Sequence, residues 1–145
     1  MIGLVVTGHG HFAAGLQTSA KMIAGENEKV KYVNFEDGMN IETLAGLLNA
    51  AYNELSDCDG IVVLSDLPGG SPFKTAVECA MTHPDKKIEV LAGTNLPMIV
   101  TGVTMIDFMD DATSFAEELL ETGKEFMVRF QLAVREEEDE EGDGI

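Results

Sequence analysis

The chain has 145 residues, of which 45% are hydrophobic and 24% are charged, which is typical of one globular domain with a genuine core. A formal net charge of −17 would repel nucleic acid and anionic lipid headgroups, and favours a basic protein partner instead. The apolar runs have only the length of strands, and the N-terminus lacks the basic segment of a secretion signal. We therefore expect a cytoplasmic protein in which Cys58 and Cys79 are buried free thiols.

The first half of the chain alternates between strand and helix patterns. Residues 2–6 are continuously apolar, as strands are in parallel sheets covered on both faces. Residues 11–24 carry apolar side chains at helical spacing and are followed by a glycine stop. Residues 30–35 alternate as a second strand. Asn40 can cap the next helix, which is expected over residues 41–55.

The second half repeats this alternation. Another apolar run predicts a third strand over residues 60–65, and a helix is expected over residues 71–82. Residues 87–92 predict a fourth strand. Two further helical stretches are expected over residues 96–108 and 111–123.

The C-terminal part differs from the rest. Residues 126–134 (FMVRFQLAV) predict a fifth strand of uncertain partner, whereas the acidic residues 136–145 have nothing to bury and are expected to form a disordered tail. The expected domain thus covers residues 1–135. The alternating elements predict a single α/β domain, a central and mostly parallel sheet with helices on both faces. Right-handed crossovers give the strand order 2-1-3-4, in which the first and third strands are neighbours.

Polar residues come directly after the first and third strands. His9 lies between two glycines, and Asp66 is followed by the run Gly69-Gly70-Ser71. Ligands bind just beyond the carboxyl ends of the strands in open parallel sheets. The expected strand order therefore brings the imidazole of His9 close to the carboxylate of Asp66.

This combination suits the handling of a phosphoryl group. Asp66 is expected to hold Nδ1–H of His9, which fixes the tautomer and leaves Nε2 as the nucleophile. Ser71 and Pro72 predict a helix start, in which serine supplies the cap oxygen and proline takes the first helical position. Backbone N–H groups at such a start bind anions, and the Ser71 hydroxyl can also donate to a phosphoryl oxygen. Lys74 could add positive charge, but it lies one turn further along the helix and is not counted among the expected site residues.

Cofactor chemistry finds little support in the sequence. His9 and His11 resemble a metal pair, but a third ligand would have to come from Asp66 or a distant acid, and no His/Cys cluster has zinc spacing. Neither a Walker A loop nor a G-x-G-x-x-G fingerprint follows the first strand. We expect no metal and no nucleotide, so the phosphoryl donor should be something other than ATP. A metal-dependent hydrolase at His9 and His11 is the competing hypothesis.

Three segments resemble the signatures of the IIA components of the mannose-type sugar phosphotransferase system (PTS). They are HGHFAAGL (residues 9–16), DLPGGSPF (residues 66–73) and AGTNLPM (residues 92–98), and the likeness extends from Met1 to about Val134. The resemblance implies a phosphotransferase with a phosphohistidine intermediate. Its histidine accepts the group from the carrier HPr and passes it to a IIB component, which phosphorylates a sugar entering through the membrane components IIC and IID.

The resemblance also implies residue roles and an assembly. His9 would be phosphorylated on Nε2, Asp66 would orient its ring through Nδ1, and Ser71 with nearby amides would contact the phosphoryl oxygens. The family forms a homodimer that exchanges a C-terminal strand, which residues 126–134 would supply. Because the chain ends in an acidic tail, IIB is expected on a separate polypeptide. Two other hypotheses are a regulatory module that senses phosphorylation and a donor domain for a dihydroxyacetone kinase system.

Overall fold

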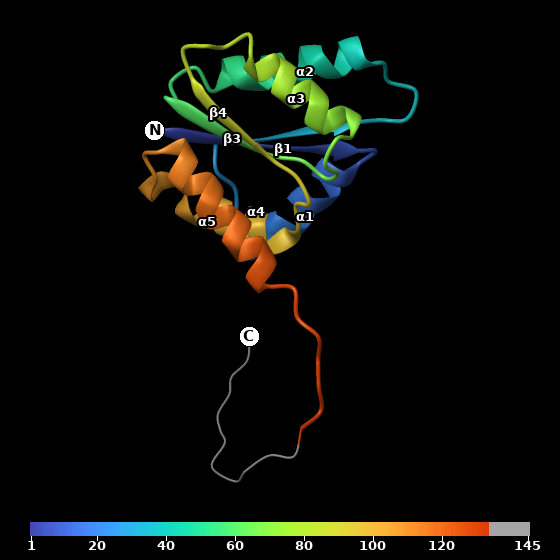
Figure 1. Cartoon of the computed structure of the whole chain (residues 1–145), viewed down its shortest axis with the longest axis vertical. Coiled ribbons are helices and arrows are strands. Elements are labelled where there is room, and N and C mark those ends of the chain that lie inside the picture. The colour runs from blue at the N-terminus through green and yellow to red at the C-terminus, as the bar shows by residue number, and fades with distance from the viewer. Residues whose placement is uncertain (134–145) are drawn as a thin grey trace.

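Four parallel strands form one central sheet with helices on both of its faces (Figure 1). The computed structural model describes residues 1–133. The strands are β1 (Ile2–His9), β2 (Val30–Phe35), β3 (Gly60–Leu64) and β4 (Lys87–Leu91). The helices are α1 (Phe12–Ala24), α2 (Ile41–Glu54), α3 (Ser71–Ala80), α4 (Leu96–Met105) and α5 (Ala112–Glu125), with a short 3₁₀ helix, η1 (Ile106–Phe108), after α4.

The strand order is β2-β1-β3-β4, which confirms the predicted order 2-1-3-4. β1 lies in the middle, where Val6 pairs with Tyr32 of β2 on one side and with Leu64 of β3 on the other. β1 runs past the expected end of its apolar segment as far as His9, because it stays paired with β2 up to Phe35. The carboxyl ends of β1 and β3 are therefore side by side at one edge of the sheet.

The two faces of the sheet carry separate hydrophobic cores. α1, α4 and α5 cover one face, and α2 and α3 cover the other (Figure 1). Because neighbouring side chains of a strand point to opposite faces, Leu4 of β1 packs toward Phe115 of α5 whereas Val5 packs toward Leu48 of α2. Each such fully buried side chain contributes about 1.5–3 kcal/mol relative to exposure. Two covered faces explain why residues 2–6 of β1 and the whole of β3 are apolar.

Three helices begin with a side-chain cap. Asn40, Asn95 and Asp111 precede α2, α4 and α5, and each side-chain oxygen accepts the backbone N–H three residues further along, at 2.7, 3.3 and 2.8 Å. Such a cap satisfies one of the donors that every helix start leaves free. The predicted cap of α2 is confirmed. Gly25 ends α1 with φ of 83°, as its predicted role requires.

The fifth strand predicted over residues 126–134 is not formed. Residues 127–133 have no strand pairing, and the segment leaves the body of the molecule after α5 (Figure 1). The side chains of Phe126, Val128, Phe130 and Leu132 are 62–89% exposed. A strand needs a neighbour to exchange hydrogen bonds with, and no other part of residues 1–133 supplies one here. Val134, the expected domain end at residue 135 and the predicted tail 136–145 lie outside the described residues.

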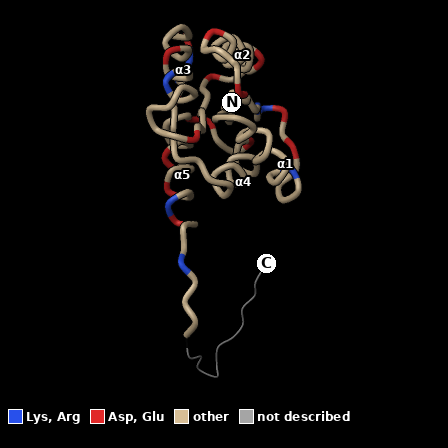
Figure 2. Tube along the Cα trace, turned by 90° about the vertical axis from the view of Figure 1, so that its right-hand side faces the viewer, with Lys and Arg blue, Asp and Glu red and all other residues tan. Residues whose placement is uncertain are grey.

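The surface carries charge on both sides of the sheet. Glutamates outnumber Lys and Arg on α2 and on α5, whereas α3 carries one Glu and one Lys (Figure 2). Among the helices of residues 1–133, none combines the length and the apolar character needed to cross a lipid bilayer.

Candidate functional site

His9 and Asp66 meet at the carboxyl ends of β1 and β3. Nδ1 of His9 lies 2.7 Å from Oδ2 of Asp66, and the same oxygen accepts the backbone N–H of His9 at 2.8 Å. The two residues are 57 positions apart in sequence, so the sheet topology alone brings them together. The predicted proximity is confirmed.

The environment of Asp66 keeps its carboxylate charged. Its Oδ1 accepts the backbone N–H of Leu67 at 2.7 Å, and its side chain is only 13% exposed. Burial alone would raise the pKa, but the hydrogen bonds from the backbone and ring of His9 and from Leu67 outweigh burial, so the pKa of Asp66 is lowered. An ionised carboxylate can only accept hydrogen bonds. Nδ1 of His9 is therefore the donor, and in the neutral ring the lone pair is then on Nε2.

Two glycines allow this close packing. A Cβ on Gly8 would lie 2.5 Å from the ring of Phe12 and 3.0 Å from Cγ of Asp66, and a Cβ on Gly70 would lie 3.0 Å from Cε1 of His9. The glycines thus let the loop after β3 approach the imidazole, while the His9 side chain stays 47% exposed. The ring is held on one side and open to a partner on the other.

Phe35 is a neighbour of His9 that the sequence analysis missed. Its ring meets the imidazole edge-on, with ring centroids 5.9 Å apart, and its carbonyl accepts the N–H of Gly10 at 2.7 Å. Phe35 ends β2 directly opposite His9 in the register. The strand-end argument used for His9 and Asp66 would have found Phe35 if it had been applied to the second strand as well.

The helix start beside His9 differs from the prediction. Gly70 is the N-cap of α3, with extended backbone (φ −73°, ψ 169°), and Ser71 is the first helical residue, so the predicted serine cap is wrong. Pro72 is the second helical residue and not the first as predicted, although it still lies in the first turn. Glycine has no side-chain oxygen, so no cap competes for the free N–H groups at this end, which include those of Ser71 and Phe73. Lys74 is exposed on the same helix.

The two histidines near the site bind different carboxylates. His9 contacts Asp66, whereas Nε2 of His11 lies 3.3 Å from Oε2 of Glu36. Among residues 1–133, no three His, Cys, Asp or Glu side chains converge as ligands of a metal ion. The geometry therefore does not favour a shared metal at His9 and His11.

Both cysteines are buried and free, as predicted. Burial raises the pKa of the Cys58 thiol and of the Cys79 thiol. Both thiols stay protonated near neutral pH, and neither resembles a reactive thiolate.

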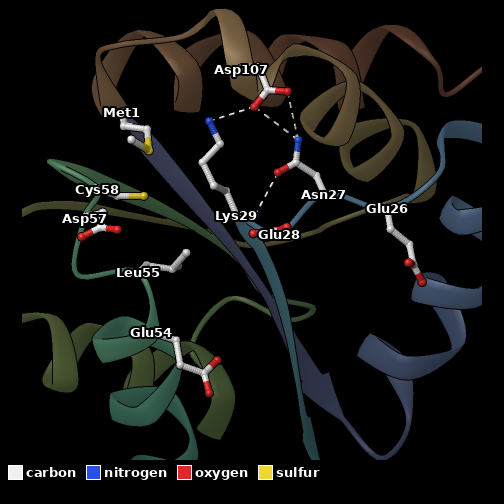
Figure 3. Close-up of a pocket in the computed structure, with 10 residues that line it drawn as sticks. All are labelled: Met1, Glu26, Asn27, Glu28, Lys29, Glu54, Leu55, Asp57, Cys58 and Asp107. Atoms are coloured by element: carbon white, nitrogen blue, oxygen red, sulfur yellow. Dashed lines mark hydrogen bonds and ion pairs between the residues drawn. The ribbon is translucent and has the colours of Figure 1, made fainter.

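A pocket of about 540 Å³ lies at the other end of the sheet, beside Met1 at the start of β1 (Figure 3). It is lined by several acids, but its Asp107 is already paired with Lys29 at 2.8 Å and with Asn27 at 3.2 Å. Ligands of parallel sheets bind at the carboxyl ends of the strands, which is the end that carries His9. We therefore place the candidate site at His9 and Asp66.

Comparisons with known proteins agree with the fold described above. The family model for the PTS system fructose IIA component (EIIA-man) matches residues 3–120. The mannose-specific EIIAB component of Escherichia coli K12 is 38% identical over 128 residues, which is 86% of this chain. The chain spans 38% of the length of that relative.

Solved structures give the same result. The phosphotransferase component EIIA from Streptococcus agalactiae has a TM-score of 0.78 at 32% identity, covering 89% of this chain and 97% of that chain. The mannose/sorbose-specific IIA subunit from Enterococcus faecalis has a TM-score of 0.81 at 25% identity, covering 92% of this chain and 98% of that chain. With the family model matched over most of its length, the chain belongs to the PTS system fructose IIA component (EIIA-man) family and is a PTS IIA component of the mannose/fructose/sorbose type.

Proposed function

We propose that this IIA component carries a phosphoryl group on Nε2 of His9, accepting it from HPr and passing it to a IIB component during sugar uptake. The observation that supports this most directly is the 2.7 Å contact between Nδ1 of His9 and Oδ2 of Asp66. With Nδ1 tied to an ionised acceptor, the other ring nitrogen keeps its lone pair. That nitrogen belongs to a half-exposed side chain that a partner protein can reach.

The transfer step follows from this arrangement. The Nε2 lone pair attacks the phosphorus of phospho-HPr, and a new N–P bond forms as the bond to the HPr histidine breaks. Positive charge develops on the His9 ring, and the Asp66 carboxylate stabilises it. The reverse sequence of bond changes delivers the group to a nucleophile of IIB: a bond from that nucleophile to phosphorus forms as the N–P bond to His9 breaks. A positioned nucleophile, a charge partner and little covalent rearrangement are the usual elements of phosphoryl transfer.

The start of α3 is the proposed site for the phosphoryl oxygens. Backbone N–H groups and the positive end of the helix dipole favour an anion at a helix N-terminus. The Ser71 hydroxyl can add a hydrogen bond of its own. Because the cap is Gly70, these donors remain free for the incoming group.

The cellular setting belongs to the same proposal. The domain would cover residues 1–135 and act in the cytoplasm, close to the membrane only through the IIC and IID components that its IIB partner serves. No metal or nucleotide takes part in the proposed steps.

The proposal is tested by labelling. The chain is mixed with HPr, the kinase of HPr and phosphoenolpyruvate, and we expect acid-labile, alkali-stable phosphate on His9. His9→Ala should abolish the label and His11→Ala should keep it. Full labelling of His9→Ala would contradict the proposal.

A second step separates a carrier from a regulatory module. The phosphorylated chain is mixed with candidate IIB proteins, and loss of label from His9 with gain on IIB is expected. A sensor would be phosphorylated but would sustain no turnover to any IIB, and a donor for a dihydroxyacetone kinase system would lose its label only to that system.

We also propose a homodimer in which residues 126–134 of each copy add a strand to the other copy. The support is the set of exposed apolar side chains between Phe126 and Leu132, Met127 included, together with β4, which ends the sheet as an unpaired edge. Uncovered apolar edges are association liabilities, and closed two-fold exchange is a common solution. Sedimentation should give a dimer for the full chain and a monomer for a chain cut after Glu125. A monomeric full chain would contradict the exchange.

A further inference from the structure

The direction of the Asp66 carboxylate depends on the two peptide groups that flank its Cα. Both are held by the loop between β4 and α4. The N–H of Gly93 donates to the carbonyl of Asp66 at 2.8 Å, and the N–H of Thr94 donates to the carbonyl of Ser65 at 3.1 Å. Fixing both peptide groups fixes the direction of the Cα–Cβ bond between them, from which the carboxylate extends to His9.

A side chain takes part in this clamp. Oγ1 of Thr94 donates to the same Ser65 carbonyl at 2.6 Å, so one residue supplies two donors to one acceptor. The Ser65 hydroxyl in turn donates to the carbonyl of Leu91 at 2.6 Å, which closes the seam between β3 and β4.

Burial gives these contacts their weight. Ser65 is 0% exposed and Thr94 is 9% exposed, so water cannot readily replace a lost donor. A hydroxyl bond in such a place is costly to remove. The contact from Thr94 lies at the carboxyl end of β3 and reaches Ser65, the residue just before Asp66.

We propose that Thr94 is a positioning residue of the phosphorylation site, whose hydroxyl holds the Ser65–Asp66 peptide so that the Asp66 carboxylate engages Nδ1 of His9. The inference rests on the proposed function for its kinetic consequence, but its geometric consequence is independent of it. The hydrogen bonds that Thr94 donates go to the Ser65 carbonyl and not to the imidazole of His9. Its effect passes through Asp66 to the tautomer of the ring.

The test compares Thr94→Val, which keeps the shape and removes the hydroxyl, with Thr94→Ser, which keeps the hydroxyl. Nitrogen-15 NMR spectra of the His9 ring report how much of it carries its proton on Nδ1. We expect Thr94→Val to lower that fraction and to slow transfer from phospho-HPr about 10-fold, as small misplacements at reacting groups do. Thr94→Ser should restore both. Should Thr94→Val fail to fold, Thr94→Ala, which also lacks the hydroxyl, is measured in its place.

Two matched variants control for the loss of a buried hydroxyl. Thr7→Val makes the same change two residues from His9 in a side chain that is 0% exposed, and its hydroxyl has no hydrogen-bond partner among the described residues. Tyr52→Phe removes a buried hydroxyl bond, to the carbonyl of Ala76 at 3.0 Å, in the core between α2 and α3. Both should keep the wild-type ring spectrum and transfer rate.

A double-mutant cycle shows whether Thr94 acts through Asp66. In an Asp66→Asn background, Thr94→Val should slow transfer no further. Wild-type ring spectra and rates in Thr94→Val would overturn the inference, and so would equal effects of the two control variants. These outcomes are read while the wild-type chain is labelled normally. Failure of the wild-type chain to be labelled counts against the proposed function instead, and the ring spectra then decide the inference alone.

Discussion

One carboxylate oxygen, Oδ2 of Asp66, receives both the ring nitrogen and the backbone N–H of His9. The other oxygen receives the N–H of Leu67. Through these three hydrogen bonds, Asp66 binds the imidazole and also holds the backbone N–H groups of His9 and Leu67. Removing its charge should therefore affect stability as well as transfer.

The pH dependence of stability follows from the lowered pKa of Asp66. A group whose pKa is lower in the folded state stabilises fully above its unfolded value, about 3.9, and less as the pH falls through the folded value. Asp66→Asn should thus cost about 1–2 kcal/mol of unfolding free energy near pH 7, and less near pH 3. Urea unfolding of both chains at each pH measures this. An equal or larger cost at the lower pH would contradict it.

The transfer rate gives a second prediction for the same residue. Asparagine offers an N–H₂ donor where the carboxylate only accepts, so it can favour the wrong ring tautomer. We expect Asp66→Asn to slow phosphorylation of His9 by at least about 10-fold. The upper limit is about 10⁴-fold, the loss that the same change causes in a Ser-His-Asp triad. Rapid quench-flow measurement of the labelling rate checks this prediction. A wild-type rate would remove Asp66 from the mechanism.

Gly70 gives a further prediction, because its neighbour is the imidazole itself. A Cβ there would lie 3.0 Å from Cε1 of His9, whereas its backbone angles suit any residue. Gly70→Ala should therefore displace the ring and slow transfer about 10-fold with little change in unfolding free energy. Gly46→Ala on α2, where a Cβ meets nothing within 4 Å, is the control and should stabilise by about 0.5–1 kcal/mol. A Gly70→Ala chain that transfers normally would show that the contact is easily relieved.

Among the helices, α3 begins in a different way from α2, α4 and α5. The three others use an Asn or Asp cap, but α3 uses Gly70, whose lack of a side chain leaves the donors of its first turn uncovered. The start of α3, which lies beside the imidazole of His9, is thus the one without a side-chain cap among these four.

This difference predicts unequal costs of two substitutions. Asn40→Ala removes a cap bond of 2.7 Å and should cost about 1 kcal/mol. Ser71→Ala removes no cap, so its unfolding free energy should change by less than about 0.5 kcal/mol, while transfer to His9 slows because a proposed donor to the phosphoryl group is lost. Thermal or urea unfolding beside the labelling rate tests both. A loss at Ser71→Ala as large as that at Asn40→Ala would argue for a capping role after all.

The elements could be predicted where the pattern is local. Apolar runs, alternation and caps gave all four strands and the start of α2, because each depends on neighbours in sequence. The start of α3 was placed correctly, yet its cap was assigned to Ser71 instead of Gly70, since both residues suit a cap and only the backbone angles decide. The strand over residues 126–134 was predicted from its mostly apolar sequence, but a strand also needs a partner, and residues 1–133 of one copy provide none.

The strand order 2-1-3-4 was predictable because handedness and short connections leave few topologies. From that order came the meeting of His9 and Asp66. Phe35 could have been found in the same way, because it ends β2 opposite His9. The hydrogen bonds of Thr94 could not, because they depend on how the loop after β4 lies beside the end of β3. A strand-end rule narrows the candidates but does not orient side chains.

At the scale of the whole molecule, the net charge of −17 predicts that association with a basic partner is fast at low salt and slower at high salt. Opposite charge speeds encounter, and salt screens the effect over about 10 Å at 0.1 M. The rate of labelling by phospho-HPr should fall about 10-fold between low salt and about 0.5 M salt. Unfolding measured in the same buffers is the control. A rate independent of salt would show that charge does not guide this encounter.

The position of the ring proton has a consequence for how the cycle can run. Because an ionised Asp66 accepts the Nδ1–H of His9, the proposed phosphoryl transfer at Nε2 of the neutral ring would leave the proton on Nδ1 in place. Loading and unloading would then be balanced in protons in both directions. The direction of transfer along the proposed relay would then depend on how much of each partner carries a phosphoryl group.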